Sequence, residues 1–248
     1  GCYEVQSYSF DMEPLLEKIG RPDVARLELK NPLSSEQRFL RTSLLPNLLG
    51  ALERSMAHSD ELKMYEIGRV FGVGGDPLPA QPYHLGGLVW RSAKAHKKLA
   101  KRELAPVAGP TALNAAYASA KGLLEHLAAQ LNLKVSYHRV EGEAAERLPM
   151  WLHPARSGEA RLHVKGEVYS LGFVGNLHPD VTDALGLGEY AAAYEWDLTP
   201  VVASGVSYGG YTPISRFPAV SVDLSIIVPE AVTHDDLHSR ILQAKWVK

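Results

Sequence analysis

The chain has 248 residues, of which 46% are hydrophobic, so it fits one large domain, or one domain plus a fragment, with a substantial buried core. Lysine and arginine total 26 against 28 aspartates and glutamates, and this balance excludes an overall attraction to polyanions such as nucleic acid. The single cysteine, Cys2, excludes an internal disulfide and a cysteine-based metal cage. With no signal-peptide pattern or long apolar run, a soluble, cytoplasmic protein is expected.

In the first third of the chain the sequence predicts strands and helices, and after them an antiparallel pair of strands. Alternating β-forming residues indicate the strands, and leucines that repeat on one face indicate the helices. In chain order the predicted elements are a strand over 3–10, a short helix over 11–19, a helix over 43–58 and paired strands over 64–71 and 83–90. Gly68 lies in the first of the paired strands, where we expect it to let another group approach closely.

The middle of the chain predicts a long helix and further strands. Residues 91–109 are rich in lysine and arginine without clear periodicity, which favours a solvated basic connection over an RNA contact. The elements that follow are a helix over 110–131 with a narrow alanine-rich stripe, a strand over 134–140, a hairpin of 160–164 and 168–174, a short helix over 178–185 and a strand over 190–198. This order is typical of an antiparallel sheet with helices packed on it.

The composition changes near the C-terminal end. Residues 204–212 are mostly glycine, serine and tyrosine and predict a linker. A strand over 220–228 and a helix capped by Thr233 and running to the last residue are expected after it. Because some thirty residues cannot bury a core alone, we expect this segment to be part of a larger domain.

Catalytic and metal-binding motifs are sparse. The sequence contains no phosphate-binding loop, Gly-x-Gly-x-x-Gly, His-Glu-x-x-His or nucleophile elbow. His234 and His238 have the i, i+4 spacing of metal ligands on a helix, but no third ligand is indicated, which favours a solvated polar face. His153, His163 and His178 fall in different predicted elements, and structural roles are favoured for them.

Three single carboxylates lie on predicted strands and are candidates to line a pocket. They are Glu4, Glu66 and Glu195. Carboxylates flanked by aromatic residues and arginine act more often as structural hydrogen-bond or ion-pair partners than as catalysts. No catalytic, cofactor-binding or metal-binding residue is therefore assigned from the sequence.

Seven stretches, taken together and in this order, have a counterpart in a known family. They are Glu4-Val-Gln-Ser-Tyr-Ser-Phe, Asn31-Pro-Leu-Ser-Ser-Glu, Leu40-Arg-Thr-Ser-Leu-Leu-Pro-Asn-Leu-Leu, Tyr65-Glu-Ile-Gly-Arg-Val-Phe, His153-Pro-Ala-Arg-Ser, Gly172-Phe-Val-Gly-Asn-Leu-His-Pro and Ile214-Ser-Arg-Phe-Pro-Ala-Val-Ser-Val-Asp-Leu-Ser. The chain resembles the β subunits of phenylalanine–tRNA ligases over nearly its whole length.

The resemblance implies an α+β fold. Residues 1–205 are expected to form a core similar to that of class II aminoacyl-tRNA synthetases, an antiparallel sheet flanked by helices that is catalytically silent in this family. Residues 206–212 would be a linker, and 213–248 the truncated N-terminal part of a ferredoxin-fold anticodon-binding domain. Val222 departs from the family, which commonly has a basic residue just before Asp-Leu-Ser, so an RNA contact made there in relatives would be absent.

The resemblance also implies a function. The chain is expected to support attachment of phenylalanine to tRNA(Phe) by assembling with a catalytic α subunit, two α chains with two β chains, and by helping to position the tRNA. ATP and Mg²⁺ would bind to the α subunit and not to this chain. The helix over 43–58 and the first strand are expected contact elements, and no editing or metal site is carried over.

Two alternatives remain open at this point. A stand-alone amino-acid-adenylating enzyme needs an arginine that clamps ATP. Arg69 lies on the equivalent strand, but the loop over 72–82 contains no Arg, Lys or His to hold a triphosphate. An RNA-binding module would rest on the basic stretch 91–102 and on the last segment, and the near-neutral net charge disfavours it.

Overall fold

The computed structural model describes residues 1–21, 25–34, 37–74, 78–100, 112–205, 220, 223, 225–229 and 232–243. The chain forms two compact units, Gly1–Val206 and Ser207–Lys248. The first unit contains a large sheet and the helices packed on it, and the described part of the second contains the helix α8 (His234–Leu242).

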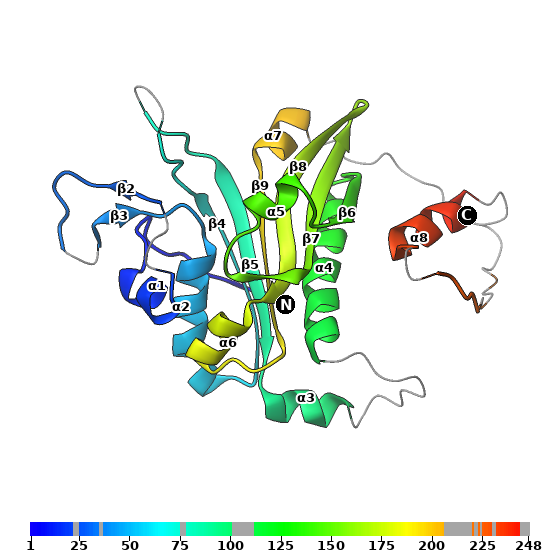
Figure 1. The fold of residues 1–248 in the computed structure, drawn as a ribbon, viewed down its shortest axis with the longest axis horizontal. Helices are drawn as coiled ribbons and strands as arrows, with labels where there is room; N and C mark the ends of the chain where they lie inside the picture. The colour runs from blue at the N-terminus through cyan, green and yellow to red at the C-terminus, as the bar shows by residue number, and fades with distance from the viewer. Residues whose placement is uncertain are drawn as a thin grey trace. The chain divides into compact units, whose positions relative to one another are not determined.

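A seven-stranded sheet forms the centre of the first unit (Figure 1). Its strands in spatial order are β1 (Tyr3–Glu4), β4 (Glu61–Arg69), β5 (Tyr83–Arg91), β9 (Ala191–Asp197), β8 (Glu167–Leu177), β7 (Leu152–Val164) and β6 (Val135–Arg139). All neighbouring pairs are antiparallel except β1 and β4, which run parallel. The prediction of an antiparallel sheet is therefore wrong at this edge, because the chain crosses over through helices between these two strands.

Helices cover both faces of the sheet (Figure 1). One face carries α1 (Glu13–Lys18), α2 (Leu45–Ser55) and α6 (Pro179–Leu185), and the other carries α4 (Ala112–Gln130). The remaining elements are a separate pair of strands, β2 (Leu27–Glu28) and β3 (Phe39–Leu40), a 3-10 turn (Met56–His58), and the helices α3 (Ala93–Ala100), α5 (Glu143–Arg147) and α7 (Thr199–Ser204). The α+β class expected from the sequence is confirmed.

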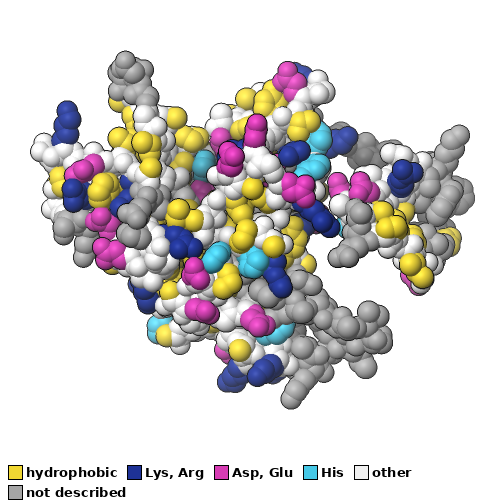
Figure 2. Space-filling view, viewed as in Figure 1, with side chains coloured by type: hydrophobic (Ala, Val, Ile, Leu, Met, Phe, Trp, Pro, Cys, Tyr) yellow, Lys and Arg dark blue, Asp and Glu magenta, His cyan; other side chains and the backbone are white. Residues whose placement is uncertain are grey.

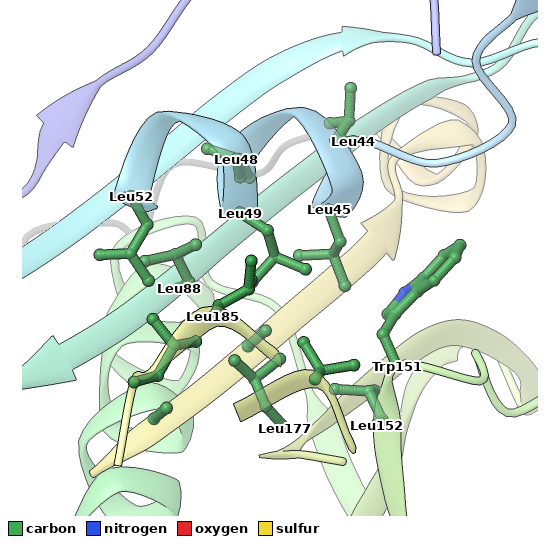
Figure 3. Close-up of a cluster of buried hydrophobic side chains, with 14 of the residues drawn as sticks. Leu44, Leu45, Leu48, Leu49, Leu52, Leu88, Trp151, Leu152, Leu177 and Leu185 are labelled. Atoms are coloured by element: carbon green, nitrogen blue, oxygen red, sulfur yellow. The ribbon is translucent and has the colours of Figure 1, made fainter. Parts of the chain in front are cut away.

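The leucine face of α2 builds the core on its side of the sheet (Figure 3). Its fully buried members are Leu45, Leu48, Leu49 and Leu52, and Leu44 just before the helix is fully buried with them. They share one apolar cluster with leucines from β5, β7, β8 and α6. Full burial of a leucine contributes about 1.5–3 kcal/mol, so this face supplies most of the free energy that holds α2 on the sheet. On the opposite face, α4 packs through the narrow stripe that its sequence predicted, which consists of Ala116, Ala120, Leu124 and Ala128.

Two predictions in the first unit are wrong in part. Only Tyr3–Glu4 of the predicted strand 3–10 is a strand, and Phe10 makes a single antiparallel bridge to Leu40 of β3. Between them the chain leaves the sheet, and the carbonyl groups of Tyr8 and Phe10 accept hydrogen bonds from a side chain of α2. Within the predicted basic connection 91–109, Ala93–Ala100 is the helix α3. Its start is marked by Ser92, whose hydroxyl accepts a hydrogen bond from the N–H of Ala95. Residues 101–109 lie outside the described part.

The second unit confirms one predicted helix start. The Thr233 hydroxyl accepts a hydrogen bond from the N–H of Asp236, and the Asp236 carboxylate accepts one from the N–H of Thr233, which is a complete capping box. This helix ends at Leu242. In the predicted strand 220–228, the described residues 220, 223 and 225–228 form no strand. The predicted linker 206–212 and Val222 lie outside the described residues.

Gly172 on β8 offers a direct test of the sheet geometry. It has a φ of +136°, and a Cβ there would lie 2.1 Å from the carbonyl oxygen of Glu195 on β9. We expect Gly172→Ala to destabilise the fold by about 2 kcal/mol or more. A Cβ added to Gly122 in α4 would meet no atom within 4 Å, so Gly122→Ala should stabilise by about 0.5–1 kcal/mol. Urea unfolding measures both, and an unchanged stability of Gly172→Ala would contradict the geometry.

Candidate functional site

A cavity of about 390 Å³ opens on the sheet beside the start of α2. Strands β5, β8 and β9 form its floor, the residues just before α2 form one wall, and residues from α5 to the start of β7 form the other. Its polar and charged lining consists of Thr42, Ser43, His84, Arg147, Ser170, Glu195 and Asp197. We call this space the sheet-face cavity, and it is the candidate site for any chemistry on the sheet.

Glu195 is the central polar group of the sheet-face cavity. One of its carboxylate oxygens accepts the N–H of Leu44 at 3.1 Å and lies 2.7 Å from Nδ1 of His84, and the other accepts the hydroxyl of Ser43. Because a carboxylate only accepts, the imidazole proton of His84 is on Nδ1. Three donors thus hold a carboxylate that is 8% exposed, and the contact fastens the start of α2 to the sheet.

A second buried carboxylate, Glu159 on β7, contacts Arg147 and Ser170, two residues that line the cavity. It accepts hydrogen bonds from Arg147, Arg161 and Ser170, each at 2.7 Å. Burial raises its pKa, but the hydrogen bonds from Ser170, Arg161 and Arg147 outweigh burial and hold the pKa below its usual range. Arg147, the cation that lines the cavity, is therefore already paired within the fold.

The third buried network lies at the other end of the loop that leads into α2. Arg41 and Glu66 are each 3% exposed, with Nη1 of Arg41 2.7 Å from Oε1 of Glu66. The Nε of Arg41 donates to the carbonyl of Arg69 at 2.9 Å, and the Ser7 hydroxyl donates to Glu66 at 2.7 Å. A Cβ on Gly68 would lie 2.3 Å from Nη2 of Arg41. The expected close approach at Gly68 is thus confirmed, and the approaching group is a guanidinium.

The carboxylates singled out in the sequence have different roles. Glu66 and Glu195 are buried hydrogen-bond partners, as favoured above, whereas Glu4 is exposed on the edge strand β1. Arg69 lies on the exposed side of β4, where its guanidinium contacts the ring of Tyr83 at 4.9 Å from the centroid.

The histidines do not form one cluster. The rings of His153 and His178 lie 6.4 Å apart between centroids, whereas His163 is hydrogen-bonded to a serine of β6. His234 and His238 stack with centroids 5.9 Å apart. Within the described part of the chain, no group of three or more His, Cys, Asp or Glu side chains is placed to hold a metal ion.

Sequence reasoning missed most residues of these networks, Glu159 and its partners among them. Arg41 and His84 carried no local signal, because their partners lie 25 and 111 positions away in the chain. The hydroxyl of Ser43 accepts the N–H of Leu45 at 3.1 Å at the start of α2, and it also donates to Glu195, which no local pattern indicated. The glycine at position 68 was the one usable signal, since it indicated a large neighbour. No helix in the described ranges is long and apolar enough to cross a membrane.

Replacing Glu66 with glutamine should destabilise the fold, because the positive charge of Arg41 would stay buried without its partner. We expect a loss of about 3–5 kcal/mol. Glu61 provides a matched control, since its side chain is 43% exposed and its ion pair with Arg91 lies at the surface. Glu61→Gln should cost less than about 1 kcal/mol. Equal losses in urea unfolding would show that the Arg41–Glu66 pair is not a buried, coupled contact.

Comparison with known proteins places the fold in a family. The family model described as the phenylalanyl tRNA synthetase beta chain CLM domain matches residues 1–198. The phenylalanine–tRNA ligase beta subunit of Moorella thermoacetica is 32% identical over 234 residues, which is 92% of this chain and 27% of that protein. That of Staphylococcus aureus (strain MRSA252) is 30% identical over 217 residues, 87% of this chain and 24% of the relative. The chain thus spans about a quarter of the length of these relatives. It belongs to the phenylalanyl-tRNA synthetase beta chain family, and it contains the CLM domain of that family.

Proposed function

We propose that this chain is the part of a phenylalanine–tRNA ligase β subunit that supports aminoacylation without performing it. Its role is to assemble with a catalytic α subunit, in a complex of two α and two β chains, and to help position tRNA(Phe). ATP and Mg²⁺ bind to the α subunit, where phenylalanine is activated. The class II-like core, the ferredoxin-like nature of residues 213–248 and a cytoplasmic location belong to the same proposal, which the family membership supports.

The observation that carries the proposal is the state of the charged groups around the sheet-face cavity. Activation of an amino acid by ATP requires cations to hold the phosphates and carboxylates to hold magnesium. Here Glu195 is held by three donors of the fold, Arg147 is paired with buried Glu159, and Arg41 is buried against Glu66. The charges that a catalytic site would need are thus used to hold the structure together, which supports a non-catalytic role.

The alternatives receive less support from the described residues. A stand-alone adenylating enzyme would need Arg69 to face bound ATP, but Arg69 packs on Tyr83 at the exposed side of β4. An RNA-binding module would need a concentrated basic face. Figure 2 shows lysine and arginine side chains interspersed with aspartates and glutamates on the face in view.

Contact with the α subunit is proposed for the segment that precedes α1 and for the last turn of α2, since residues 45–52 of α2 are buried within the chain. Tyr3 and Tyr8 in that segment are 65% and 77% exposed. Exposed aromatic side chains are common in the centre of protein interfaces, where they lose contact with water on assembly. The proposal therefore predicts that these tyrosines become buried when the α subunit binds.

Co-expression with the α subunit of the same organism tests this function. We expect a stable complex by size-exclusion chromatography with light scattering, with a mass that corresponds to two copies of each chain. Tyr8→Asp should weaken the complex at least tenfold, because a charge would be buried at the contact. Tyr83→Asp is the matched control, since Tyr83 is 50% exposed on another part of the sheet, and it should bind like the wild type. Failure of the wild-type chain to form a complex would refute the proposal.

A further inference from the structure

Three hydrogen-bond acceptors in the lining of the sheet-face cavity are open to solvent. The imidazole proton of His84 is on Nδ1, which faces Glu195, so its Nε2 has a free lone pair. The Asp197 carboxylate accepts the N–H of Thr199 at 2.8 Å through Oδ1, which leaves Oδ2, and Thr42 contributes its hydroxyl oxygen. These three atoms have no hydrogen-bond partner in the described part of the chain, and none of them is a buried atom. A ligand in the cavity can therefore reach all three.

The pairing of β5 with β9 brings two of these acceptors together. His84 and Asp197 are opposite each other in the register, so their side chains leave the same face of the sheet, with Cβ atoms about 4.5–5.5 Å apart. Thr42 reaches the same cavity from the segment that leads into α2. Acceptors from three separate segments thus converge on one space, which suits a ligand group that carries several donors.

The charges of the lining favour a cation over an anion. Two carboxylates, Glu195 and Asp197, line the cavity with one guanidinium, that of Arg147. The three donors that hold Glu195 are neutral, so they leave its negative charge in place. No cation of the described residues pairs with Asp197, whereas Arg147 is already paired with Glu159 at 2.7 Å. The field inside the cavity is therefore negative.

The remaining walls are apolar and include two aromatic rings. Pro149, Trp151 and Phe173 line the cavity, and Figure 3 shows Trp151 at the side of the leucine cluster of α2. Aromatic rings pack well against apolar groups and also attract an ammonium group that lies within about 6 Å of the ring. The volume of about 390 Å³ lies within the range of about 300–1,000 Å³ that is typical of small-molecule sites. There is thus room for one small organic molecule.

We propose that the sheet-face cavity binds a small primary amine with a compact apolar body. Its ammonium group donates to the Asp197 carboxylate, to Nε2 of His84 and to the hydroxyl of Thr42, and its body lies against the aromatic wall. An ammonium group has three N–H donors and no acceptor, which matches three open acceptors beside a free carboxylate. The inference goes beyond the proposed function, because binding of the amine requires neither the α subunit nor tRNA.

Three probes that share one ring but differ in charge test the ligand class. They are benzylamine, which is a cation at neutral pH, benzyl alcohol, which is neutral, and benzoate, which is an anion. In an NMR titration of the 248-residue chain, benzylamine should bind with a dissociation constant of about 1 mM or tighter and shift the indole N–H signal of Trp151. Benzyl alcohol should bind at least about tenfold more weakly, and benzoate more weakly still. No binding of benzylamine, or equal binding of the three probes, would overturn the proposal.

Two variants separate the ammonium site from a general affinity for apolar rings. Asp197→Asn keeps an acceptor for the N–H of Thr199 but removes the charge, so benzylamine should bind at least about tenfold more weakly while benzyl alcohol binds as before. His84→Asn can still donate to Glu195 but ends before the position of Nε2, so it should weaken benzylamine binding about threefold or more. The matched control is Asp183→Asn, because Asp183 is exposed on α6 outside the cavity, and it should bind benzylamine like the wild type.

The outcomes distinguish this site from the proposed function. Benzylamine affinity that is unchanged in Asp197→Asn, or lowered as much by Asp183→Asn, would show that the amine does not bind at Asp197. The probe series on the wild type decides the ligand class even where a variant fails to fold. A chain that binds benzylamine but forms no complex with the α subunit would refute the proposed function and leave the amine site standing, and the reverse result would refute only the amine site.

Discussion

The attachment of helix α2 to the sheet is the contact on which the rest of this structure depends. Its leucines fill the core on one face, and Glu195 holds its first turn through the Leu44 N–H and the Ser43 hydroxyl. Just before the helix, Arg41 reaches under Gly68 to pair with Glu66. Apolar burial supplies most of the stabilisation, and the buried polar contacts set where the helix begins and how it is oriented.

The same contacts bear on function. A carboxylate that holds a helix start has its oxygens occupied, and an arginine buried against a carboxylate has lost most of its capacity to bind a phosphate. The sheet-face cavity therefore has the lining of a polar site but few free charges.

The sequence predicted those features that depend on neighbouring residues. Leucine periodicity identified α2, the alanine-rich stripe identified α4, and Gly68 indicated a close approach. It could not show that β1 runs parallel to β4, because strand direction depends on the path of the chain through the helices between them. Nor could it pair His84 with Glu195, since pairs so distant in the chain leave no local pattern. The helix α3 was missed because a single capping residue, Ser92, marks its start in an otherwise basic stretch.

The central claim is that this chain supports phenylalanine activation without performing it. Phenylalanine-dependent exchange of pyrophosphate into ATP tests the claim most directly, with the purified chain alone, the α subunit alone and the two together. The account predicts no exchange by this chain alone and measurable exchange by the complex. Exchange by the purified chain alone would contradict it, because the charges around the sheet-face cavity would then be free to bind ATP.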